Sequence, residues 1–208
     1  MRVRRSWMLA LGALFTLAGC ATAIKTHYHT LSVAPAVPAE AAEAAVGPAA
    51  NRVAAYRVAI GPASVPDALD RPQIVLSSQP GRLEFSDAEN WSAPLKREIP
   101  RVLAEVVGQR LPAAHVKAYS QYGGQDADFG VLIDVLRFES RPGDSITLKV
   151  AWAVRGRDGA RLHEARSVKV EKVSSPGVAP LVAAHQNALA ALGREIAGVV
   201  AALAQAKR

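Results

Sequence analysis

The chain has 208 residues, of which 50% are hydrophobic and 21% are charged, and its formal net charge is +7. The length allows one folded domain with a tail, and the single cysteine excludes an intramolecular disulfide. The basic residues are scattered and are not interleaved with aromatic residues, so we do not expect nucleic-acid binding. We expect this charge to form a solvated surface, and a weak attraction to anionic lipid headgroups is the alternative.

Residues 1–19 have the layout of a secretory signal peptide. Arginines at positions 2, 4 and 5 precede an apolar run from Trp7 to Leu17, and the small residues Ala18 and Gly19 follow it. This run is about half as long as the ~20 residues that a helix needs to span a bilayer. We therefore expect an exported chain without a lasting transmembrane anchor at this end.

The only cysteine, Cys20, follows Leu17-Ala18-Gly19, and this tetrapeptide resembles the lipobox of bacterial lipoproteins. The resemblance implies that Cys20 receives a diacylglycerol, becomes the N-terminus after cleavage and is then acylated on its amine. The alternative is an ordinary signal peptide that ends in a free cysteine. By resemblance to enteric lipoproteins, Ala21 in place of Asp favours the outer membrane, with the protein facing the periplasm.

Residues 20–50 are expected to form a lipidated N-terminus and a linker. Within them, Ala34–Ala50 consists almost entirely of Ala, Pro, Glu and Val and contains three prolines, which is typical of a linker or a surface insertion. Residues 51–208 are then the folded domain. Ahead of the linker, Ile24–Val33 has the pattern of a short extended segment.

The domain is expected to open with a strand, Arg52–Ile60, that ends at Gly61-Pro62. Two short extended runs, Ile74–Ser77 and Arg82–Phe85, flank Gln79-Pro80-Gly81. Because Pro-Gly fits the centre of a tight turn, these two runs are predicted to form a hairpin.

A helix should follow, because apolar residues recur at helical spacing from Leu95 to Val106. Asn90 or Ser92 is the expected N-cap, and Pro94 fits the first turn, where its missing N–H costs little. Gly108 or Leu111-Pro112 is expected to end this helix.

The second half of the domain predicts a short strand, three long strands and a helix. Hairpin turns separate the long strands, and the middle one alternates apolar and small or polar residues, so one face is buried. The segments are Val116–Ser120, Phe129–Glu139, Ser145–Arg155, Arg161–Val173 and about Val178–Ala204. The order of elements predicts an α+β fold with a mixed, largely antiparallel sheet and two main helices packed on it.

The search for reactive groups finds little. His27 and His29 alternate on an extended segment and so share a face, but no third ligand is near in sequence, and a bound metal is not expected. His185 is expected beside the apolar stripe of the last helix. No nucleophile motif, phosphate loop or calcium loop is present. We therefore expect no enzymatic activity and no cofactor other than the lipid on Cys20.

Three stretches resemble the ABC-type transport auxiliary lipoproteins, the PqiC-like family. They are His27–Leu31 after the lipobox, Val65–Val75, and Asn90–Leu95 at the start of the helix. Their order and spacing match the family across nearly the whole exported chain, and the Ala34–Ala50 stretch departs from it.

The resemblance implies a non-enzymatic accessory subunit at the outer-membrane end of a lipid transport system. Its partner would be an MCE-domain periplasmic protein and, through it, an ABC transporter, with self-association left open. Val65–Trp91 is turn-rich and carries the densest likeness, so Trp91, Leu69 and Arg71 are the candidate contacts; the alternative is that Trp91 only packs the first helix. Two other functions remain open, a structural envelope lipoprotein and a domain that carries lipid in its own cavity.

Overall fold

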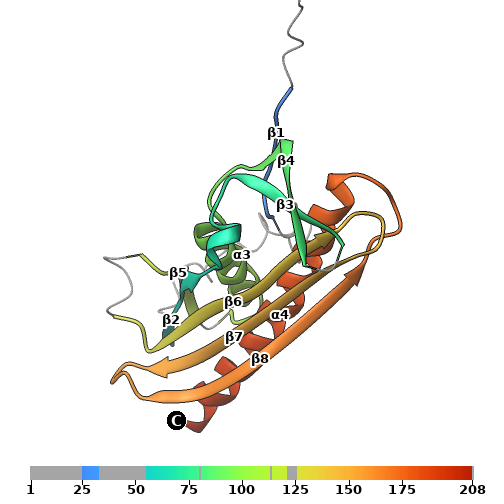
Figure 1. Cartoon of the computed structure of the whole chain (residues 1–208). Helices are drawn as coiled ribbons and strands as arrows, with labels where there is room; N and C mark the ends of the chain where they lie inside the picture. The colour runs from blue at the N-terminus through green and yellow to red at the C-terminus, as the bar shows by residue number, and fades with distance from the viewer. Residues whose placement is uncertain (1–24, 33–54, 80, 113, 121–125, 208) are drawn as a thin grey trace, which may run out of the picture.

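The computed structural model describes residues 25–32, 55–79, 81–112, 114–120 and 126–207. The signal peptide, Cys20 and the Ala34–Ala50 linker lie outside the described residues, so the expectations for them stay predictions. The described part contains one mixed sheet of eight strands and two long helices (Figure 1). The expected α+β class is confirmed.

The described residues form eight strands and three helices. The strands are β1 (His27–His29), β2 (Tyr56–Ser64), β3 (Gln73–Gln79), β4 (Arg82–Trp91), β5 (Ala114–Ala118), β6 (Phe129–Arg141), β7 (Ser145–Gly156) and β8 (Arg161–Lys172). The helices are the single 3₁₀ turn η3 (Asp67–Leu69), α3 (Leu95–Arg110) and α4 (Val178–Ala206). All three long strands, the hairpin and both main helices were predicted from the sequence, with ends that differ by a few residues.

Strand β6 organises the sheet. One edge of β6 pairs with β7, which pairs with β8, and both pairings are antiparallel. Along its other edge, β6 pairs in parallel first with β2 and then with β3 at Leu76 and Ser140. Strand β5 extends the sheet from β2, and β4 and β1 extend it from β3. The longest ladders are antiparallel, as expected, and the short strands contribute the parallel pairs.

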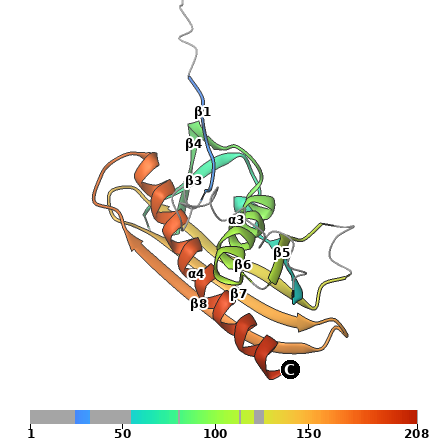
Figure 2. The same cartoon turned by 180° about the vertical axis from the view of Figure 1, so that it is seen from behind.

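Helices α3 and α4 lie side by side on one face of the sheet (Figure 2). A Cβ atom at Gly193 of α4 would lie 2.6 Å from a methyl carbon of Val106 on α3, so glycine permits the close crossing of the two helices. By length and composition α4 is apolar enough to span a membrane. Its apolar side packs against the sheet and α3, which identifies it as the core helix of the domain.

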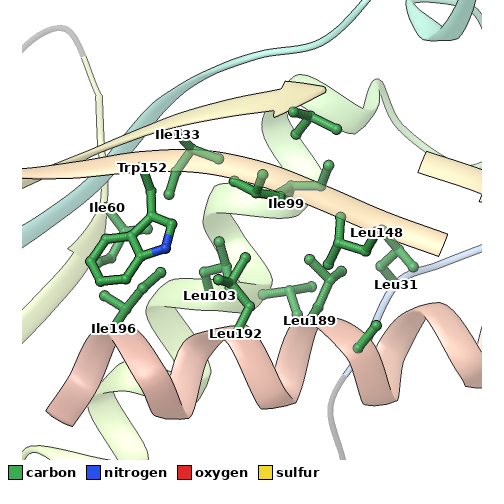
Figure 3. Packing of buried hydrophobic residues seen from close by; sticks show 14 of the residues in the cluster. Leu31, Ile60, Ile99, Leu103, Ile133, Leu148, Trp152, Leu189, Leu192 and Ile196 are labelled. Atoms are coloured by element: carbon green, nitrogen blue, oxygen red, sulfur yellow. The ribbon is translucent and has the colours of Figure 1, made fainter. Parts of the chain in front are cut away.

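The alternation predicted for β7 is confirmed. Its inward-facing side chains are all at most 3% exposed, and they form one cluster with residues of both helices (Figure 3). These inward-facing residues are Ile146, Leu148, Val150, Trp152 and Val154.

The predicted end of β2 at Gly61-Pro62 is wrong. The strand continues to Ser64 and pairs with β6 again after a register shift between Ile60 and Ala63. Gly61 has a φ of 109°, and the peptide bond to Pro62 is cis. Proline lacks a donor for a sheet ladder but is tolerated at such an irregularity, so the strand absorbs both residues instead of stopping.

The predicted capping of α3 is also wrong. Asn90 belongs to β4, Pro94 is the N-cap, and none of the side chains that the structure describes caps the helix. Ser92 instead binds the β1 segment. Its amide donates a hydrogen bond to the carbonyl oxygen of His29 at 2.8 Å, and its hydroxyl shares a hydrogen bond with the Thr30 hydroxyl at 2.8 Å.

The segment directly after the expected anchor is part of the fold. Strand β1 runs parallel to β4, and Leu31 just beyond it is 0% exposed and belongs to the main core. The carbonyl oxygen of Leu31 accepts a hydrogen bond from Arg101 of α3, and that of Thr30 accepts one from Gln186 of α4. Strand β1 and Leu31 therefore belong to the same sheet and core as the rest of the described chain.

Replacing Leu31 by Ala should lower the free energy of unfolding by about 2–5 kcal/mol, the usual cost of truncating a fully buried leucine. Urea unfolding of a soluble Cys20→Ser form would measure it. The control is Tyr28→Ala on the same strand, where the side chain is 69% exposed and the expected change is within about 0.5 kcal/mol. Equal, small effects of the two changes would contradict the docking of this segment.

Candidate partner-binding groove

An apolar groove of about 340 Å³ opens where β3 diverges from β2 along β6. The turn η3 closes one side of it, β3 and the first residues of β4 close another, and the second half of β6 forms the floor. Its lining residues are Pro66, Ala68, Leu69, Val75, Leu76, Ser77, Gly81, Leu83, Leu136, Arg137, Phe138 and Glu139. Eight of these twelve lining residues thus come from the Val65–Trp91 stretch highlighted by the sequence.

A β-bulge in β6 presents apolar surface to this groove. The pairing with β7 shifts register between Val135 and Arg137, and Leu136 in the bulge is left 39% exposed. Leu83, from the neighbouring hairpin, is 46% exposed. Bulges re-aim side chains and are frequent beside functional sites, and two exposed leucines on one groove form a surface suited to an apolar partner.

Leu69 and Arg71, two of the three predicted contacts, lie at this end of the molecule. Leu69 lines the groove and is 8% exposed, so it contributes to the wall more than to the open surface. The guanidinium of Arg71 stacks 3.9 Å above the ring centroid of Phe85, which is itself 43% exposed. The Nε of Arg71 is buried and has no hydrogen-bond partner among the described residues.

Trp91, the third predicted contact, lies in the core. It is 4% exposed and makes edge-to-face contacts with Phe138 at 5.9 Å and with His185 at 6.3 Å between ring centroids. This burial supports the alternative that Trp91 packs in the interior of the domain. The Trp91 side chain therefore has little surface left to contact a partner. Leu83, Phe85 and Leu136, which the sequence analysis did not single out, present the exposed apolar surface instead.

The sequence analysis expected His185 beside the apolar stripe of α4. In the structure it lies in the core beneath the groove. Its ring is 1% exposed and stacks on Phe138 with centroids 3.8 Å apart. Its Nε2 shares a hydrogen bond with the Ser140 hydroxyl at 2.8 Å, whereas Nδ1 has no partner within the described part of the chain. Burial lowers the pKa of His185 to about 3, because an apolar surrounding disfavours the imidazolium form.

The buried imidazole makes stability depend on pH. In the unfolded chain His185 binds a proton below its ordinary pKa of 6.5, whereas in the folded chain it stays neutral down to about pH 3. The free energy of unfolding therefore falls as the pH falls from 6.5 toward 3. The loss should be about 2 kcal/mol between pH 6.5 and pH 5. His185→Gln should flatten this dependence in denaturant unfolding, and the exposed His115→Gln should retain it. Equal pH dependence in both variants would contradict the assignment.

His27 and His29 share one face of β1, as predicted, and both contact Glu89 of β4. The nitrogen–oxygen distances are 3.0 Å for His27 and 2.5 Å for His29. The hydrogen bond from His29 and then that from His27 lower the pKa of Glu89. Sequence spacing could not reveal Glu89, because it lies about sixty positions further along the chain. Within the described residues, no group of three His, Cys, Asp or Glu side chains is arranged to hold a metal ion.

A second groove, of about 600 Å³, crosses the outer surface of β6, β7 and β8. Small side chains at Ala151 and Ala153 form its floor, and Arg161, Glu164 and Arg166 border it. Charged residues of both signs stay hydrated there and neutralise one another. The groove at Leu83 and Leu136 is therefore the stronger candidate for binding an apolar partner.

The α+β sheet with two helices on one face defines the class of the domain, and sequence comparison assigns its family. The chain belongs to the family of ABC-type transport auxiliary lipoprotein components, whose family model matches residues 37–197. The resemblance stated from the sequence is thereby confirmed. No curated protein matches the sequence.

Two crystal structures share the fold. One is described as an uncharacterized protein, with 16% sequence identity and a TM-score of 0.67, covering 85% of this chain and 99% of that one. The other is the protein XCC0632 from Xanthomonas campestris, with 19% identity and a TM-score of 0.64, covering 88% of this chain and 100% of that one. At these identities the likeness shows the fold alone.

Proposed function

We propose that this protein is a membrane-anchored, non-enzymatic accessory subunit at the outer-membrane end of a lipid transport system. Its partner is an MCE-domain periplasmic protein that connects it to an ABC transporter. The family, an auxiliary lipoprotein component of ABC-type transport, supports this role. The observation that carries the proposal is the apolar groove with its exposed leucines, Leu83 and Leu136, inside the matched region.

The packing of the domain favours a binding role over that of a lipid carrier. The space between the sheet and the two helices is occupied by core side chains (Figure 3), whereas carriage of a whole acyl chain requires an interior cavity. The groove beside η3 is a surface feature of a size that suits a few side chains of a partner. This reasoning leaves the structural envelope lipoprotein as the competing function, which capture of a transport partner would exclude.

Attachment to the membrane is assigned to Cys20. Mass spectrometry of the mature N-terminal peptide should find acyl chains on this residue, because Cys20 follows the lipobox-like Leu17-Ala18-Gly19. Several acyl chains, at about 0.8 kcal/mol per buried methylene, give stable membrane attachment. Cys20→Ser should release the protein from the outer-membrane fraction or leave an uncleaved precursor. An unmodified peptide that begins at another residue would exclude the anchor.

The groove is tested by placing a charge on it. Leu83→Asp or Leu136→Asp should reduce capture of the co-expressed MCE protein from detergent-solubilised envelopes by about tenfold or more, because a carboxylate buried against an apolar partner costs well over ~1.4 kcal/mol. The matched control is Leu162→Asp on β8, at 42% exposure against 46% for Leu83.

All three leucines are exposed, so melting temperatures should change little in each variant. Equal capture by the groove variants and the control would remove the groove from the interface. Failure of the unaltered protein to capture any MCE protein would count against the transport role itself.

A further inference from the structure

The structure restricts how the domain sits on its membrane. Residues 27–32 are fixed to the domain by the β1–β4 pairing, by the buried Leu31, and by hydrogen bonds to Ser92, Arg101 and Gln186. Only six residues lie between Cys20 and His27, so the two are seven Cα-to-Cα steps apart. A fully extended chain of that length spans at most about 25 Å, so the N-terminal end of β1 must stay within that distance of the attachment point.

This tether is short compared with the domain. Gln186, which contacts the β1 segment, lies twenty residues before Ala206 at the end of α4. That part of the helix is about 30 Å long at 1.5 Å per residue. If α4 stood upright with its C-terminal end on the bilayer, β1 would therefore lie too far from the surface for the six connecting residues to reach it. Figures 1 and 2 both place β1 at the end of the molecule opposite the C-terminus.

The exposed surface at the β1 end fits a lipid surface. Tyr28 is 69% exposed beside the point where the chain leads to Cys20. Tyrosine is enriched at membrane–water interfaces, where its ring meets the acyl boundary and its hydroxyl meets the headgroups. The neighbouring imidazoles, His27 and His29, already bond Glu89, so the polar side of β1 is satisfied within the protein.

We propose that the β1 end of the domain faces the bilayer, with Tyr28 at the headgroups, and that the β7–β8 turn and the C-terminus of α4 point away from it. This orientation rests on the proposed lipid anchor at Cys20. It also places the apolar groove near the membrane. Strand β3 lies two strand spacings from β1, about 10 Å, so a partner must approach to within about 35 Å of the bilayer to occupy the groove.

The orientation can be measured with single labels, because acylated Cys20 leaves the mature chain without a thiol. Asp87→Cys lies on the membrane side, since β4 runs parallel to β1 and Asp87 precedes Glu89, the partner of His27. Ala160→Cys in the β7–β8 turn and Ala202→Cys on α4 mark the far end. All three positions are exposed, and a fluorophore on each would report quenching by nitroxide headgroups in phosphatidylethanolamine–phosphatidylglycerol vesicles that carry the full lipoprotein.

The label at Asp87 should be quenched several-fold more strongly than the labels at Ala160 and Ala202. A Gly-Ser spacer of about twelve residues inserted after Ala21 lengthens the reach by roughly 40 Å and should remove most of that difference. Equal quenching at the three positions, stronger quenching at the far end, or a difference that survives the spacer would overturn the orientation. Mass spectrometry of the same protein distinguishes failure of the orientation from failure of the lipid anchor. Equal quenching in an acylated protein overturns the orientation alone, and a protein without acyl chains overturns the anchor as well.

Discussion

The burial of Leu31 is the constraint on which the arrangement of this protein depends. A fully buried leucine contributes about 1.5–3 kcal/mol, a substantial part of the 5–15 kcal/mol that stabilises a typical domain. Leu31 belongs to the same cluster as Leu148 of β7 and Leu189 of α4 (Figure 3). The residues that follow the proposed lipid attachment site are therefore held by the centre of the fold, and membrane attachment and domain position are coupled.

The same packing supports the candidate groove. Strand β1 holds β4 through the pairs that end at Trp91, and Trp91 packs on Phe138, whose strand forms the groove floor. The bulge at Leu136 and the turn η3 then shape an open surface on a rigid base. For the proposed transport role, this surface offers apolar side chains, Leu83 and Leu136, that the core does not bury.

Local patterns predicted the elements whose partners are near in sequence. The alternation in β7 and the apolar stripe of α4 were sufficient because each strand or helix buries one face. The β1 segment was not assigned to the domain, because its partner strand is about sixty residues away and the Ala/Pro-rich stretch suggested a linker. The N-cap was predicted wrongly for the same reason, because Ser92 bonds β1 rather than capping α3. Core packing of Trp91 was one of the two alternatives from the sequence, but the rings that cover it, Phe138 and His185, come from two later elements that spacing could not identify. The groove combines η3, β3, β4 and β6, so spacing along the chain could suggest its region but not its lining.

The attachment of β1 to the core in the membrane-bound protein is tested most directly by amide hydrogen exchange at Ser92. The amide of Ser92 donates to the carbonyl oxygen of His29 at 2.8 Å, so this amide is protected only while the β1 segment is docked. In the acylated protein on vesicles, its exchange should be slowed to the extent seen for core amides such as that of Val150, which open only with global unfolding. Exchange at the rate of an unstructured peptide, with Val150 still protected, would contradict a domain held to the membrane by its own fold.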